Sequence, residues 1–129
     1  MPRFSKKSLD NLATCVPLLQ LIAKEAIVCV DFSVVWGHRP KDKQNILVGE
    51  GYSDLKWPLS KHNRWPSKAF DIVPWPINWD DRERFFFLAG MMLTIARSKG
   101  VGLRWGGAWN GQFNTKEQRD DLAHFELLE

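Results

Sequence analysis

Two short motifs, far apart in the chain, place the strongest constraint on how it folds. The first runs through residues 60–71 as Ser-Lys-His and then Ala-Phe-Asp, and the second is Asp-Leu-Ala-His-Phe-Glu-Leu at 121–127. Together they offer two imidazoles and a carboxylate, from His62, His124 and Asp71. Such a set can hold a zinc ion and leave one coordination position open for water, as a catalytic zinc requires. For the three groups to act together, a loop carrying His62 and two neighbouring strands carrying Asp71 and His124 have to converge.

An acidic residue accompanies the second motif. Asp121 lies three residues before His124, where it could take a proton from a water at the open position. If His124 lies on a strand, Glu126 shares its face by the two-residue period and is an alternative base. The remaining histidine, His38, is more typical of a hydrogen-bonded structural residue. These residues predict a small zinc hydrolase.

Length, composition and charge limit the kinds of protein that this chain can form. The 129 residues leave room for one domain, residues 1–129, and 44% hydrophobic with 26% charged residues is a globular balance. The net charge of +3 is modest, and the basic clusters at 3–7 and 41–43 are too short to indicate nucleic-acid binding. Mild basicity would help the protein approach an anionic polymer such as a cell wall.

The cysteines and the N-terminus bear on where the protein is made. Cys15 and Cys29 lie in apolar surroundings without CxxC spacing, so we expect two buried thiols and synthesis in a reducing cytoplasm. The first ten residues lack the apolar stretch of a secretory signal peptide. Three charged residues interrupt the apolar segment 18–35, which therefore predicts no stable membrane insertion.

The pattern of apolar and turn residues predicts an α+β fold. Seven tryptophans are present, several beside Pro or Gly in expected loops, and they either line a cleft or fill the core. We expect a short helix through Cys15 that is capped by Ser8 or Asp10. A long helix should be capped by Asp80 or Asp81, end at Gly100 and carry an apolar stripe at Phe85, Leu88, Met92 and Ile95/Ala96. The other expected elements are helices at 17–26 and 41–48, a loop at 49–66, and strands at 27–36, 69–73, 103–105 and 124–127.

The order of these motifs resembles a known family. The chain is similar to the D-alanyl-D-alanine carboxypeptidase (VanY-like) zinc peptidases of bacterial cell walls. The similarity lies in three motifs: Ser-x-His, Ala-x-Asp, and an acidic residue three positions before the His of His-Phe-Glu-Leu. Within that group the chain is most similar to phage endolysins that act as L-alanyl-D-glutamate peptidases. The resemblance extends over nearly the whole chain, through Phe4 to Ser8, Leu12, Gly37-His38-Arg39, Gln44, Gly51-Tyr52-Ser53 and Arg104-Trp105-Gly106-Gly107.

The resemblance implies a role for individual residues. It makes His62, Asp71 and His124 the zinc ligands, Asp121 the general base and later acid, and Arg39 the group that binds and polarises the substrate carbonyl. Four further residues are expected to contact the substrate or to support the ligands: Ser60, Gln44, Ser53 and Trp105.

The resemblance also implies a fold and an activity. The fold is a small single domain with a mainly antiparallel sheet covered by helices, as in hedgehog-type and DD-peptidase domains. The implied activity is zinc-dependent hydrolysis of the L-alanyl-D-glutamate bond in peptidoglycan by a monomeric endolysin. Such an enzyme is made in the host cytoplasm without a signal peptide and reaches the wall after membrane permeabilisation.

Two alternatives remain open at this point. One is a D,D-carboxypeptidase that removes a terminal D-alanine. The other is a non-catalytic wall-binding or phage structural protein with the same fold. The second is favoured by Ala108 and Asn110, which are uncharged, Ala108 standing where similar proteins often carry an acid. The interval of nine positions between His62 and Asp71 is also long for this family, so the loop between them should bulge.

Overall fold

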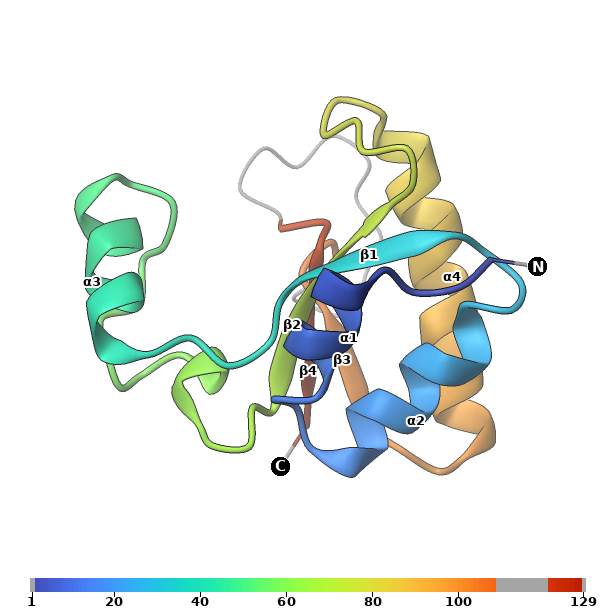
Figure 1. Ribbon diagram of the computed structural model, residues 1–129, viewed down its shortest axis with the longest axis horizontal. Coiled ribbons are helices and arrows are strands. Elements are labelled where there is room, and N and C mark those ends of the chain that lie inside the picture. Colours follow the sequence, from blue (N-terminus) through green and yellow to red (C-terminus); the bar gives the residue numbers. More distant parts are fainter. Residues whose placement is uncertain (1, 109–120, 129) are drawn as a thin grey trace.

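One antiparallel sheet organises the chain in the computed structural model, which describes residues 2–108 and 121–128. Within these residues the sheet has four strands in the order β1-β2-β4-β3, and every neighbouring pair is antiparallel (Figure 1). The predicted α+β class, with a mainly antiparallel sheet and covering helices, is confirmed. In chain order the elements are α1 (Lys6–Leu12), α2 (Pro17–Ala26), β1 (Phe32–Trp36), α3 (Lys41–Gly49), the 3-10 helix η1 (Lys61–Asn63), β2 (Ala69–Pro74), α4 (Arg82–Ser98), β3 (Leu103–Trp105) and β4 (His124–Leu127).

Successive side chains of β2 point alternately into the hydrophobic core and to the opposite face of the sheet, which carries the motif residues. Phe70 and Ile72 belong to the main hydrophobic core, together with apolar side chains of α1, α2, α4 and the other strands. Successive side chains of a strand point to opposite faces, so Asp71 and Val73 point away from that core. Val73 instead packs with Phe85 in a second, smaller cluster. Most apolar side chains of the helices thus pack against one face of the sheet, and the polar motif residues lie on the other.

The predicted helices are present, with some changes at their ends. α2 begins at Pro17 and α3 directly follows Pro40, and α4 buries the expected apolar stripe at Phe85, Leu88 and Met92. The first helix ends earlier than expected, at Leu12. The predicted cap at Ser8 or Asp10 was wrong, because both residues lie within α1. The N-cap is Ser5, whose Oγ accepts a hydrogen bond from the Ser8 backbone N–H at 3.1 Å.

The prediction of a strand over 27–36 was wrong in its first half. The backbone N–H groups of Cys29 and Val30 both donate to the Ala26 carbonyl, at 3.0 and 3.1 Å, so the chain continues turning after α2. β-branched residues at 27–30 favoured a strand, but local hydrogen bonds at the helix end prevail over that propensity. The strand begins only at Phe32, where pairing with β2 becomes available.

The two cysteines have different environments. Cys15 is buried, and this burial raises the pKa of its thiol to about 12. Cys29 is exposed in the turn after α2, so the expectation that both thiols are buried was wrong. Both are free.

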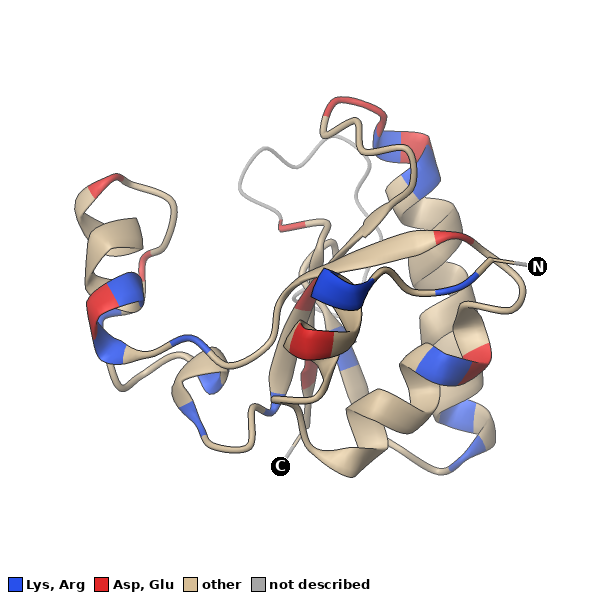
Figure 2. Ribbon diagram, viewed as in Figure 1, with Lys and Arg blue, Asp and Glu red and all other residues tan. Residues whose placement is uncertain are grey.

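The segment from α3 to η1 extends away from the sheet (Figure 1). Gln44 is the buried residue of α3, and apolar side chains around it, including Ile46 and Tyr52, are exposed. Acidic and basic residues lie side by side at the start of α3 and at the start of α4 (Figure 2), as is typical of solvated surface. In the described residues, no helix combines the length and the apolarity that crossing a bilayer requires.

Gly37, directly after β1, provides a test of how closely α1 packs on the sheet. A Cβ atom at this position would overlap the Asn11 carbonyl and the Thr14 hydroxyl and lie 3.0 Å from Cys15 Sγ. We expect Gly37→Ala to lower the free energy of unfolding by about 1–3 kcal/mol, the usual effect of overpacking. Gly90→Ala is the matched control, because an added Cβ there meets no atom within 4 Å and α4 gains a better helix former. Urea unfolding of both variants measures the difference, and equal stabilities would contradict the packing assigned to Gly37.

Candidate metal centre

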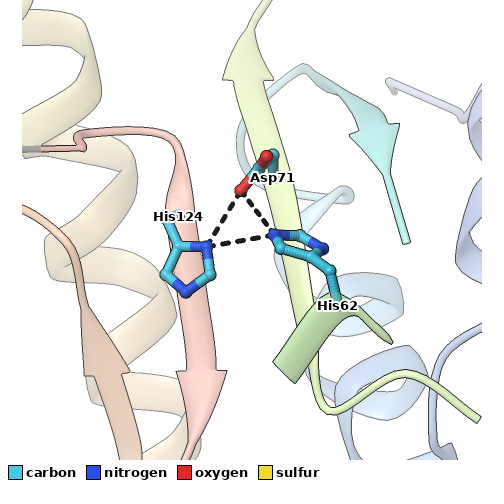
Figure 3. Close-up of side chains that lie close together, drawn as sticks. All are labelled: His62, Asp71 and His124. Atoms are coloured by element: carbon cyan, nitrogen blue, oxygen red, sulfur yellow. Dashed lines mark hydrogen bonds and ion pairs between the residues drawn. The ribbon is translucent and has the colours of Figure 1, made fainter. Parts of the chain in front are cut away.

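Strand pairing places two of the three motif side chains side by side. Asp71 on β2 is the register partner of His124 on β4, and η1 brings His62 over the same face (Figure 3). The facing atoms form a nearly equilateral triangle. His62 Nε2 and His124 Nδ1 are 3.1 Å apart, and each lies 3.1 Å from Asp71 Oδ1. All three residues are buried.

A local capping arrangement holds His62 in η1. Ser60 is the N-cap: its Oγ accepts from the His62 backbone N–H at 3.2 Å, and its own N–H donates to Asn63 Oδ1 at 3.1 Å. The long interval between His62 and Asp71 bulges outward, as expected. Lys68 N–H donates to the Lys61 carbonyl at 3.3 Å, which closes the bulge and returns the chain to β2.

The outer nitrogen of each imidazole determines what the inner nitrogen offers. His62 Nδ1 lies 2.8 Å from the Gly37 carbonyl, and His124 Nε2 lies 2.8 Å from Glu126 Oε1. Both partners are acceptors, so both outer nitrogens carry hydrogens. In the neutral rings the inner nitrogens therefore present lone pairs to one another and to the Asp71 carboxylate. Three acceptors in contact need a positive charge between them, which either a proton or a metal ion can supply. Tetrahedral zinc ligands with bonds of about 2.0–2.1 Å have a comparable separation.

The pKa shifts of Asp71 and His124 show that this cluster favours a bound positive charge. Burial alone would raise the pKa of Asp71, but the two histidines hold it far below its ordinary value. Burial alone would lower the pKa of His124, and its hydrogen bonds to Asp71 and Glu126 outweigh this and raise it to about 9. A bound metal would have to displace a proton from this ring. The residues present therefore fit a divalent metal ion, as His62, Asp71 and His124 were predicted to do.

Arg39 connects the cluster to the projecting segment. Its guanidinium donates to Asp71 Oδ2 at 3.2 Å and to Gln44 Oε1 at 3.1 Å, and it lies 4.8 Å from the ring centroid of Trp36. Gln44 in turn donates to Ser53 Oγ at 3.0 Å. Burial lowers the pKa of Arg39, and the negative charges of Asp71 and Asp121 oppose that shift. A guanidinium has five N–H donors, so Arg39 keeps capacity for a further acceptor.

The segment after β3 positions Asp121. Gly106 N–H donates to the His124 carbonyl at 2.8 Å, and Asp121 N–H donates to the Gly106 carbonyl at 3.0 Å. A Cβ atom at Gly106 would overlap the Asp121 carbonyl, so only glycine permits this approach. Asp121 is exposed by residue area, but desolvation of its carboxyl at the site and the negative charge of Asp71 raise the pKa of that carboxyl.

A pocket of about 760 Å³ opens over the cluster. Trp36 lines it beside Arg39, and Trp79, which stacks on Phe85 with ring centroids 5.8 Å apart, lines it as well. The cleft-lining interpretation therefore holds for these two tryptophans. The predicted site residues that line the pocket are Arg39, Ser53, Ser60, His62, Asp71, Asp121 and His124.

Other residues named from the sequence lie outside the pocket. Trp105 is buried in the core, where its Nε1 donates to the Leu122 carbonyl at 2.7 Å, so it supports the chain before His124 and does not reach the pocket. Ala108 packs against the main core. Asn110 lies outside the described residues. Lys61 forms an ion pair with Glu126 at 3.0 Å. This contact could not be predicted from the sequence, because a single lysine beside a ligand has no distinguishing pattern.

The fold and the site together define a class: small α+β domains with an open, three-ligand candidate metal centre on an antiparallel sheet. Comparison with known proteins narrows this class. The family model described as phage L-alanyl-D-glutamate peptidase matches residues 1–128. An L-alanyl-D-glutamate peptidase of Escherichia phage T5 is 32% identical over 135 residues, which cover 98% of this chain and 98% of that protein.

A solved structure agrees with the sequence comparisons. The crystal structure of the Serratia marcescens L-Ala D-Glu endopeptidase ChiX matches with a TM-score of 0.78 at 27% identity, covering 98% of this chain and 91% of that one. The chain belongs to the phage L-alanyl-D-glutamate peptidase family, and the resemblance drawn from its motifs is confirmed.

Metal binding at the cluster should be visible as a change in thermal stability. A ligand that binds only the folded state at 100 times its Kd adds about 2.7 kcal/mol to the free energy of unfolding. We expect zinc to raise the Tm of the chelator-treated protein and to leave that of His62→Ala unchanged. His38→Ala is the matched control, since its ring contacts the Arg64 carbonyl and Trp65 and not the cluster. A full zinc-dependent shift in His62→Ala would exclude this residue as a ligand.

Proposed function

We propose that this protein is a zinc-dependent peptidase that hydrolyses the bond between L-alanine and D-glutamate in the stem peptides of peptidoglycan. The observation that carries the proposal is the triangle of acceptor atoms, 3.1 Å on each side, within the pocket of a member of this family. The cell wall is the proposed place of action, reached after the inner membrane has been permeabilised.

The donor set favours zinc. Two imidazole nitrogens and one carboxylate oxygen leave a fourth position open, the pattern of catalytic zinc sites. His62, Asp71 and His124 would hold the ion, and when bound it would act as a Lewis acid and lower the pKa of a water molecule to about 7.

Asp121 is the proposed general base. Its carboxylate lines the pocket with the ligands, and a raised pKa makes it a better proton acceptor than an ordinary aspartate. We assign it the proton of the attacking water, which it holds on a carboxylate oxygen and then donates to the amide nitrogen of the departing D-glutamate. The same carboxyl thus serves as base and then as acid.

Arg39 is the proposed electrostatic stabiliser of the reacting carbonyl. The ion pair with Asp71, the bond to Gln44 and the Trp36 ring fix the guanidinium at the pocket wall before substrate arrives. A donor fixed in advance requires no reorganisation as negative charge develops on the carbonyl oxygen. Ser53 supports this arrangement through Gln44.

The products of murein digestion test the bond that is cut. We expect the purified protein to release stem peptides with a free amino group on glutamate, and to leave L-alanine on the glycan strands. Mass spectrometry of the digested muropeptides identifies both products. Release of single D-alanine residues would instead establish the D,D-carboxypeptidase alternative, and an absence of any cleavage with zinc bound would favour the non-catalytic one.

Asp121→Asn tests the role of the general base independently of metal binding. A positioned general base contributes about 10²–10⁴-fold to rate, so we expect kcat on purified murein to fall by that factor while the zinc-dependent Tm shift persists. Asp80→Asn is the control, an exposed aspartate that does not line the pocket, and it should keep the wild-type rate. Wild-type turnover by Asp121→Asn would remove this residue from the mechanism.

A further inference from the structure

An ion pair joins the two segments that carry the histidines. Lys61 directly precedes His62, and Glu126 follows His124 by two residues on β4. Lys61 Nζ lies 3.0 Å from Glu126 Oε2 and donates to the Leu127 carbonyl at 2.6 Å. The η1 segment is therefore attached to β4 at two points.

The same carboxylate also contacts a histidine ring of the cluster. Glu126 Oε1 accepts from His124 Nε2 at 2.8 Å, while Oε2 faces the Lys61 ammonium, so its two oxygens have different partners. The Glu126 side chain is 14% exposed and that of Lys61 is 22% exposed, which limits screening by solvent. With both oxygens engaged, Glu126 is poorly placed to serve as the alternative base.

We propose that Lys61 and Glu126 form a clamp that positions both histidines for metal binding, by fixing the spacing of η1 and β4 and by keeping the proton of His124 on Nε2. This inference rests on the metal site of the proposed function and extends it to two positioning residues. A carboxylate that accepts from the outer nitrogen of a ligand imidazole fixes the ring and its tautomer, and its loss commonly weakens metal binding 10–100-fold.

The clamp and simple electrostatics make opposite predictions for Lys61. Removing a cation near a divalent metal ion lowers Coulomb repulsion, so charge alone would make Lys61→Met bind zinc more tightly. If Lys61 instead holds Glu126 and β4 in place, Lys61→Met binds zinc more weakly. A lower zinc affinity in Lys61→Met therefore indicates positioning, and a higher zinc affinity indicates a general charge effect.

Zinc affinity, measured by competition with a chromophoric chelator and without any substrate, tests the clamp. We expect the zinc Kd to rise about 10–100-fold in Glu126→Leu and about tenfold in Lys61→Met. Lys61→Arg should recover much of the affinity, because a guanidinium can bridge the same carboxylate. In the double variant the two effects should not multiply, since both act through one contact.

Lys99→Met is the matched control. It removes another ion pair between separate segments, Lys99 to Glu25 at 2.7 Å, which does not touch the pocket, and should leave the zinc Kd unchanged. Zinc binding by Lys61→Met that is as tight as wild type, or tighter, would overturn the clamp.

A measurement on the metal-free protein keeps this test independent of the proposed function. Proton–nitrogen correlation NMR should show a solvent-protected Nε2–H of His124 in the wild type and in Lys99→Met, and its loss in Glu126→Leu. If the wild type bound no zinc but showed this proton, the zinc assignment would fail and the contact that forms the clamp would stand. An unprotected Nε2–H in the wild type would overturn the clamp itself.

Discussion

The pairing of Asp71 with His124 across β2 and β4 is the contact on which the rest of the site depends. It places a carboxylate and an imidazole on one face of a buried sheet, and η1 adds His62 at 3.1 Å from both. Three acceptor atoms at this separation repel one another unless a cation lies among them. In the metal-free protein, a proton on His124 and the Arg39 ion pair offset the charge of Asp71, and a bound metal ion would replace that proton.

Backbone groups around the cluster maintain this arrangement. The Gly37 carbonyl orients His62, and the absence of a side chain at Gly37 and Gly106 lets α1 and the Asp121 segment approach closely. Arg39 and Gln44 extend the network to the wall of the pocket, and Lys61 with Glu126 joins η1 to β4. The support therefore comes from several elements, none of which carries the site alone.

The sequence predicted most elements of the fold because their signals are local. Pro17 and Pro40 precede helices, the apolar stripe of α4 has helical spacing, and 124–127 has the period of a strand. The errors arose where tertiary or end effects prevail over propensity. The residues at 27–30 favour a strand by composition, yet they complete a turn after α2, and Cys29 is exposed despite apolar neighbours.

By itself, the sequence determined which side chains are available for chemistry and, through the order of the motifs, the family that they resemble. Only the tertiary structure decided which of them meet, because His62 and His124 are separated by 62 positions and their contact depends on sheet register. It also assigned Trp105 to the core, Trp36 and Trp79 to the pocket, and Glu126 to the outer nitrogen of His124. Residue spacing cannot specify such contacts, since direction and distance between segments arise from packing of the whole domain.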